Sequence, residues 1–232
     1  VTGVQTCALP IFICNNIFKI GITAFLLDGF LMVSSLLLNN LSARYGDYAV
    51  AGFGISLRLV QLSEFIGMGL YMGVVPLIAY AYTAKNIKRM KKVINTTTTY
   101  ILILTIFISL IIFIFRNPIY HLFSRDVNVI NTGIYILIAM LISSLFAAIT
   151  GIITCIFQAI GRAKEATIMS MTQGILLIPI MISGNYIFGL HGLIWSTTVA
   201  EVLTCLVGLC LWIKFNRNTT KIDSDLDFNN CL

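Results

Sequence analysis

Three carboxylic acids lie inside long apolar stretches of this 232-residue chain, where charged side chains are least expected. Asp28 is at the middle of the first stretch, Glu64 is near the centre of the second, and Glu201 is at the middle of the last. An ionised carboxylate at the centre of a bilayer costs about 2.5 to 3.5 kcal/mol on insertion scales. Each acid is therefore expected to face protein or water, or to carry a proton. Three acids at one depth predict a proton or cation site.

The second apolar stretch adds a basic and an amide side chain to these acids. Arg58, Gln61 and Glu64 recur at every third residue, which on a helix with about 100° per residue forms a slanted ridge along one side. Arg58 is the expected counter-ion for one of the acids. The alternative is structural: Arg58 pairs with Asp28 or Glu64, and the pair only fixes the packing of the helices.

Other polar residues and two prolines inside the apolar stretches give weaker signals. Gln158 and Gln173 are candidates for lining a cavity, although hydrogen bonding between helices explains a lone amide well. Pro76 and Pro179 predict kinks, because proline cannot donate the helical hydrogen bond. A kink at Pro179 would be a hinge, a binding feature or an inert bend.

Hydrolytic and nucleotide-dependent chemistry find no support in the motifs. The sequence has no HExxH, no Cys/His cluster, no nucleophile elbow and no phosphate-binding loop. Its six cysteines show neither metal-ligand nor disulfide-framework spacing. We therefore predict that the chain is not an enzyme and that it needs no metal or cofactor, only H⁺ or Na⁺ as a coupling ion for secondary transport.

The composition predicts the helices that must position these groups. Hydrophobic residues make up 58% of the chain and charged residues only 10%, against about 25% charged residues in soluble domains. A membrane-spanning helix needs about 20 apolar residues, and open sheets cannot satisfy their backbone groups in lipid. We predict an all-α polytopic membrane protein with six transmembrane helices, the second of them long and irregular. The apolar stretches cover about 17–38, 49–83, 94–115, 133–160, 166–187 and 190–213.

The positions of the Lys and Arg residues predict the orientation. Eleven of the fifteen fall on one side of the predicted membrane and three on the other, with Arg58 inside a span. The positive-inside rule places the eleven, and both ends of the chain, in the cytoplasm of a plasma-membrane protein. The basic run 85–92 could bind anionic lipid or nucleic acid, but its position between helices favours a cytoplasmic anchor, so we expect no nucleic-acid partner.

The two ends of the chain differ from the apolar part. Residues 1–11 resemble translated sequencing-adapter bases, with an ordinary polar linker as the alternative, and we exclude them from the fold. Residues 214–232 are polar without periodicity and predict a disordered cytoplasmic tail. A missing start suggests that the chain is the C-terminal part of a longer protein.

Three blocks of residues resemble one known family. GMGLYMGVVPLIAYAYTAKNIKRMKK at 67–92 resembles the end of the eighth helix, and the loop after it, in multidrug and toxic compound extrusion (MATE) transporters. FQAIGRAKEATIMSMTQGILLIPIMI at 157–182 is similar to their tenth-to-eleventh helix junction, and YGDYAVAGFGISLR at 45–58 to the start of their eighth helix. The likeness extends over about residues 17–213.

This resemblance implies that residues 12–213 are the C-terminal six-helix lobe of a twelve-helix transporter of two lobes. Such transporters export small amphipathic or cationic molecules in exchange for protons or sodium by alternating access. The implied partners are the substrate, membrane lipid and a missing N-terminal lobe. A lipid-linked oligosaccharide flippase is an alternative that ranks lower. Its cavity must receive an anionic pyrophosphate and is expected to be cationic, whereas the spans hold one basic residue, Arg58, and three acids. A non-transporting scaffold would fit if the acids were fully paired.

Overall fold

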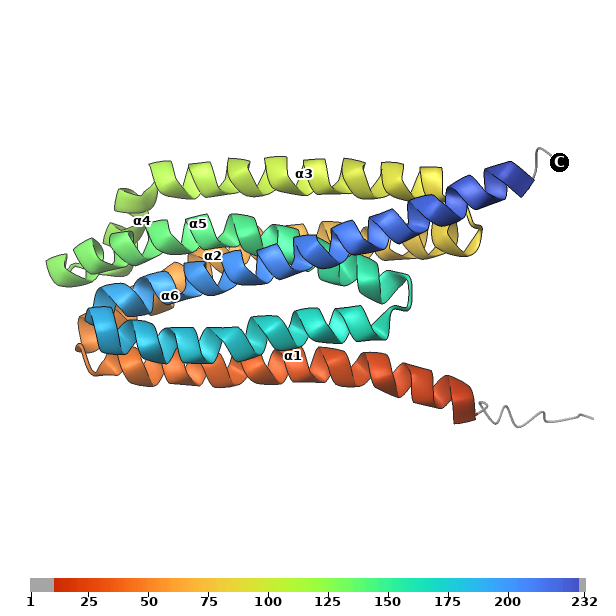
Figure 1. The fold of residues 1–232 in the computed structure, drawn as a ribbon. Coiled ribbons are helices and arrows are strands. Elements are labelled where there is room, and N and C mark those ends of the chain that lie inside the picture. The colour runs from red at the N-terminus through yellow and green to blue at the C-terminus, as the bar shows by residue number, and fades with distance from the viewer. Residues whose placement is uncertain (1–10, 230–232) are drawn as a thin grey trace, which may run out of the picture.

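The computed structural model describes residues 11–229 and places all its regular structure in helices, as the sequence predicts. Asn86 and Asp126 cap two of the helices by accepting hydrogen bonds from the backbone N–H groups of Arg89 (3.0 Å) and Asn128 (2.9 Å). In chain order the helices are α1 (Ile11–Ala43), α2 (Asp47–Thr83), α3 (Ile87–Ile114), α4 (Arg116–Phe123), α5 (Val127–Ala159) and α6 (Ala163–Asn229) (Figure 1).

The last helix is two antiparallel arms that meet at Gly189. This residue has φ 59° and ψ −136°, a conformation that L side chains disfavour and glycine tolerates. The chain reverses there, so that a first arm (163–188) and a second arm (190–229) lie side by side (Figure 1). The reversal falls between the fifth and sixth apolar stretches of the sequence.

Among the described residues, four helices, α2, α3, α5 and α6, are long and apolar enough to cross a membrane. With the two arms of α6 taken separately, and with the 33-residue α1 beside the first arm, six long segments match the six predicted stretches (Figure 1). The second stretch forms one 37-residue helix that continues through Pro76, as predicted. The short helix α4 was not predicted, and it lies in the connection between α3 and α5.

Small residues bring the helices into close contact. Phe30 of α1 packs directly on Gly174 of the first arm, where any side chain would clash with its ring. Gly52 of α2 also packs closely against Gly133 of α5, where an added Cβ would lie 3.2 Å from the Gly133 Cα. Helices thus approach through glycines, as is common inside membranes.

The buried apolar side chains form two separate clusters along the bundle. We call them the first core and the second core. The first core lies toward α4 and the Gly189 turn and includes Leu38, Phe53, Leu59, Ile136, Leu141, Met181 and Ile194. The second core lies toward the α2–α3 and α5–α6 turns and includes Ile78, Met90, Ile101, Ile152, Phe157, Met169 and Phe215.

The ends of the chain require one correction. Residues 214–229, predicted to be disordered, continue the second arm as helix to Asn229. No Gly or Pro follows Gly208, so nothing in the sequence stops the helix that begins inside the apolar stretch. Residues 1–10 and 230–232 lie outside the described residues, which leaves most of the predicted leader and the last residues of the tail untested.

Candidate functional site

A band of polar side chains separates the two cores. On α2 it lies between Leu59 and Ile78, and on the second arm between Ile194 and Phe215. We call this band the polar layer. Its members come from α2, α3, α5 and both arms of α6, and they are Ser63, Glu64, Thr105, Ser143, Ser144, Gln173, Glu201 and Thr204.

Glu201 makes the most specific contact in the polar layer. The Nε2 amide of Gln173 on the first arm donates a 2.9 Å hydrogen bond to Oε1 of Glu201 on the second arm. The other carboxylate oxygen, Oε2, is buried and has no hydrogen-bond partner among the described residues. An acid with one bare buried oxygen can take a proton or a cation there, because a bare buried charge is unfavourable.

Glu64 of α2 lies close enough to Glu201 for the two carboxyl groups to interact electrostatically. It interacts in the same way with Tyr71, two turns further along α2. The side chain of Glu64 is exposed, whereas that of Glu201 is partly buried. The polar layer therefore contains one acid on the surface of the bundle, Glu64, and one acid inside it, Glu201.

Asp28 lies on α1 with an exposed side chain. Phe30, two residues later, packs on Gly174, which directly follows Gln173. Two helical residues correspond to about 3 Å along the axis, so Asp28 lies near the level of Gln173. The structure thus places the three predicted acids at a similar level, with Asp28 on the surface of the bundle.

Arg58 does not form the predicted ion pair. Among the side chains that the structure describes, the one salt bridge joins Arg162 to Glu165, with 2.8 Å between Nη1 and Oε1. Arg58 is exposed, and its Nη1 donates a 3.5 Å hydrogen bond to Oε1 of Gln61, one turn along the ridge. Six residues separate Arg58 from Glu64, which turns the two side chains to different faces of the helix.

The remaining predicted residues lie apart from Glu201. Gln158 is at the end of α5, where it is half-buried beside the α5–α6 turn rather than in the polar layer. Pro76 and Pro179 lie within α2 and within the first arm, and both are exposed. The carbonyl of Pro179 accepts a 2.6 Å hydrogen bond from the Ser183 hydroxyl.

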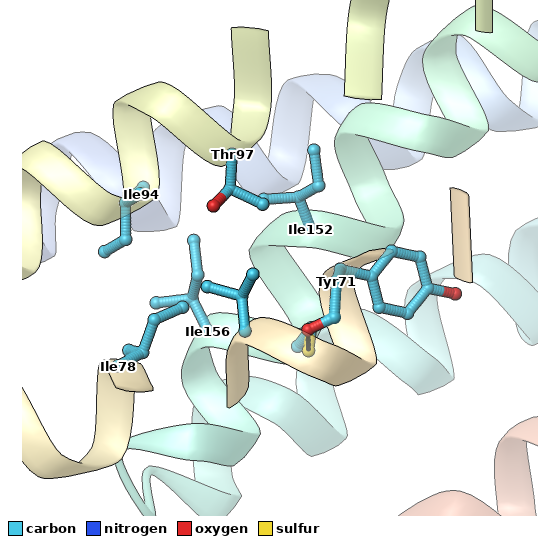
Figure 2. Close-up of a pocket in the computed structure, with 8 residues that line it drawn as sticks. Tyr71, Ile78, Ile94, Thr97, Ile152 and Ile156 are labelled. Atoms are coloured by element: carbon cyan, nitrogen blue, oxygen red, sulfur yellow. Dashed lines mark hydrogen bonds between the residues drawn. The ribbon is translucent and has the colours of Figure 1, made fainter. Parts of the chain in front are cut away.

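A small pocket lies in the second core, between α2, α3 and α5. Figure 2 shows its lining, which consists of Tyr71, Thr97 and several isoleucines, among them Ile78 and Ile152. Cys155 also lines the pocket, and its thiol donates a 3.6 Å hydrogen bond to the backbone carbonyl of Tyr71. About 10 Å³ of room fits one water molecule, so this pocket is too small for an exported compound.

A buried hydroxyl pair on the other side of the polar layer was missed by the sequence reasoning. Tyr120 of α4 is completely buried, and its Oη lies 2.6 Å from the Oγ of Ser56 on α2. Tyr120 also donates a 2.8 Å hydrogen bond to the carbonyl of Gly133 on α5. Burial raises the pKa of Tyr120 to about 12, with the Ser56 hydrogen bond opposing the shift. A tyrosine in the short connection between two apolar stretches was the available signal.

These features define a multi-pass helical membrane protein with a carboxylate inside its bundle. The family model MatE matches residues 21–183, more than half of the chain. Multidrug export protein MepA of Staphylococcus aureus is 39% identical over 210 residues, which cover 90% of this chain and 46% of MepA. The MepA protein of Staphylococcus saprophyticus is 37% identical over 208 residues, with the same coverage. The chain belongs to the MatE family, whose members are transporters rather than enzymes.

Solved structures agree with this fold. A variant of the Vibrio cholerae MATE transporter VcmN has a TM-score of 0.83 at 20% identity, covering 94% of this chain and 50% of that one. An outward-facing multidrug resistance MATE family transporter has a TM-score of 0.84 at 16% identity, with the same coverage. The chain spans about half the length of the relatives it matches.

Proposed function

We propose that this chain forms one lobe of a cation-coupled exporter of small amphipathic or cationic molecules. The proposal is supported by 39% identity to MepA, whose name describes multidrug export, over 90% of the chain. It is also supported by acids inside membrane-spanning helices, which are functional candidates by default. Export would proceed by alternating access, with the lobes rocking about a site near the middle of the membrane.

The proposed cation coupling rests on one observation, the buried carboxylate oxygen of Glu201. Its Oε2 is buried without a partner among the described residues, while its Oε1 is held by Gln173. A proton or a sodium ion at Oε2 would neutralise the acid in one state of the transporter. Release of that ion in the other state, toward Glu64 and the open side of the bundle, would couple transport to an ion gradient.

The exposed acids of α1 and α2 support a cavity shared with a second lobe. Asp28 and Glu64 have exposed side chains although both lie in long apolar helices. A Cβ added at Gly69 or at Gly73 of α2 would meet no atom within 4 Å, so this part of α2 is not packed against another helix of the described chain. A partner lobe of similar size would cover this side and receive the substrate between the two lobes.

The distribution of basic side chains supports an orientation in the membrane. The Lys and Arg residues of the α2–α3 and α5–α6 turns lie at the same end of the bundle, because both turns pack on the second core. We place this end, and with it both termini, in the cytoplasm of the plasma membrane.

The test is gradient-driven efflux of a cationic dye by the intact gene product that carries this chain. Glu201→Gln is expected to abolish coupled efflux while insertion into the membrane is retained, because the neutral amide has no negative charge for a proton or cation to neutralise. Glu165→Gln makes the same chemical change in a surface ion pair and is expected to keep efflux. Unchanged efflux by the Glu64→Gln/Glu201→Gln double variant would contradict the proposal.

A further inference from the structure

The first two turns of α3 carry a cationic face. Lys88, Arg89 and Lys92 are exposed, and their spacing of three and four residues places them on one side of the helix. Lys85, also exposed, lies in the turn just before the helix begins at Ile87. The opposite side packs on the second core through Met90, which is completely buried. The basic residues at the start of α3 therefore gather on one exposed side of the helix. Orientation in the membrane requires only positive charge at this end, not charge on one side of a helix.

The same face of α3 changes character along the helix. One turn after Lys92 it presents the exposed polar side chains of Asn95 and Thr96. It then becomes aromatic and aliphatic: Tyr100 is 65% exposed, Ile103 59% and Phe107 58%. Along one strip of surface the order is cationic, polar, aromatic and aliphatic.

Among the side chains that the structure describes, no acid forms a salt bridge with Lys85, Lys88, Arg89 or Lys92. The sequence has no Asp or Glu between Glu64 and Asp126. The one salt bridge of the described residues uses Glu165 on the neighbouring α5–α6 turn, and its arginine, Arg162, also stacks 4.8 Å above the ring of Phe215. A partner for Lys85, Lys88, Arg89 and Lys92 therefore has to be an anion other than the described side chains.

The dimensions of the strip match one leaflet of a bilayer. With 28 residues, α3 is about 42 Å long, close to the full thickness of a bilayer with its headgroups. Its first turns then lie among the headgroups, whose layer is roughly 5 to 8 Å deep on each side. Lys92 and Thr96 are four residues apart, which is about 6 Å along the helix. The change from charge to polar groups occurs over the depth at which a phospholipid changes from phosphate to ester.

We propose that this face of α3 binds a phospholipid with an anionic headgroup. The phosphate lies between Lys88, Arg89 and Lys92, with Lys85 adding to the positive potential. Asn95 and Thr96 donate hydrogen bonds to the glycerol and ester oxygens below it.

The acyl chain of this lipid lies along Tyr100, Ile103 and Phe107. A nucleic acid does not fit the strip, because the cationic face continues directly into an apolar one. Figure 1 shows α3 at the edge of the bundle farthest from α1, which leaves this face open to lipid when a second lobe covers the exposed acids of α1 and α2.

The test measures retained lipid by native mass spectrometry of the intact gene product, purified from nanodiscs that contain equal amounts of phosphatidylglycerol and phosphatidylcholine. The wild type is expected to retain phosphatidylglycerol preferentially. Lys88→Gln/Arg89→Gln/Lys92→Gln is expected to lose that preference, and Lys88→Arg/Lys92→Arg to keep it. The matched control, Arg44→Gln/Arg116→Gln/Arg125→Gln, removes three positive charges at the other end of the bundle and is expected to behave as the wild type.

The outcomes separate this inference from the proposed function. Absence of a phosphatidylglycerol preference in the wild type would overturn the lipid site, and so would an equal loss in the matched control, which would show that only net charge matters. Dye efflux is measured on the same preparations. Loss of lipid preference with efflux retained supports the site without bearing on the acids of the polar layer.

Discussion

The hydroxyls of Ser56 and Tyr120 lie 2.6 Å apart and fasten the short helix α4 to the long helices α2 and α5. Tyr120 donates its proton to the carbonyl of Gly133, so the single proton of the Ser56 hydroxyl is shared between Tyr120 Oη and the carbonyl of Gly52, which is 2.8 Å away. A side chain at Gly133 would overlap the Tyr120 ring, so the glycine makes room for it. A polar pair buried at one end of the bundle thus fixes a connection that lies outside the membrane-spanning helices.

Removing the Tyr120 hydroxyl is expected to destabilise the fold. Tyr120→Phe leaves Ser56 without one partner and the Gly133 carbonyl with a weaker one, which costs about 1 to 2 kcal/mol for buried groups. Thermal unfolding in detergent measures this loss. Tyr100→Phe alters an exposed tyrosine of α3 and should leave the unfolding temperature unchanged. Equal effects of the two variants would show that the buried network contributes nothing.

Stability should also fall at high pH through the same residue. The pKa of Tyr120 is raised from 10.0 to about 12 in the fold. Above pH 10 the unfolded chain loses this proton while the folded chain retains it, so the folded state binds more protons and stability decreases as the pH rises. The contribution is complete below pH 10 and is lost between pH 10 and about 12.

Chemical unfolding across this range, with Tyr120→Phe as the reference, isolates one tyrosine from the others. The difference in unfolding free energy between wild type and Tyr120→Phe should shrink as the pH approaches 12. A difference that stays constant across the range would contradict the assignment.

The membrane-spanning segments could be predicted from the sequence because length and hydropathy determine them. A stretch of about 20 apolar residues has few alternatives in lipid, and the division of α6 into two arms follows the break at Gly189. The short helix α4 was missed because eight residues are too few for a periodic signal.

The side-chain contacts around the polar layer were less predictable, because the spacing of residues along one helix does not show which other helix packs against them. The ridge of Arg58, Gln61 and Glu64 was recognised, yet Arg58 contacts Gln61 rather than an acid. The partner of Glu201 is Gln173, 28 residues away on the other arm, and only the reversal at Gly189 brings the two together.

The reversal itself gives a third prediction. At Gly189, φ of 59° combined with ψ of −136° is a backbone conformation that any Cβ disfavours, so Gly189→Ala should lower stability by about 1 to 2 kcal/mol. Gly54→Ala is the control, since Gly54 is in a helix with open space around its Cβ position and alanine favours helix there. The measurement is the unfolding temperature of each variant in detergent. A loss in Gly54→Ala as large as that in Gly189→Ala would show that the turn conformation is not the cause.

The hydrogen bond between Gln173 and Glu201 can be tested as a pair. Gln173→Leu removes the donor and Glu201→Gln removes the negative charge, so the two changes should not be additive in unfolding free energy. We expect a coupling of about 0.5 to 2 kcal/mol, the range found for hydrogen bonds between helices in membranes and for those to charged groups. Unfolding of the two single variants and the double variant in detergent gives this energy.

Gln158→Leu supplies the matched control for that cycle, because Gln158 is a half-buried amide at the end of α5, outside the polar layer. Its effect should add to that of Glu201→Gln, since the two side chains share no hydrogen bond among the described contacts. Dye efflux provides a second readout: Gln173→Leu should weaken coupling in the wild-type background and change little once Glu201 is glutamine. Additive energies in both cycles would mean that Gln173 does not position the carboxylate.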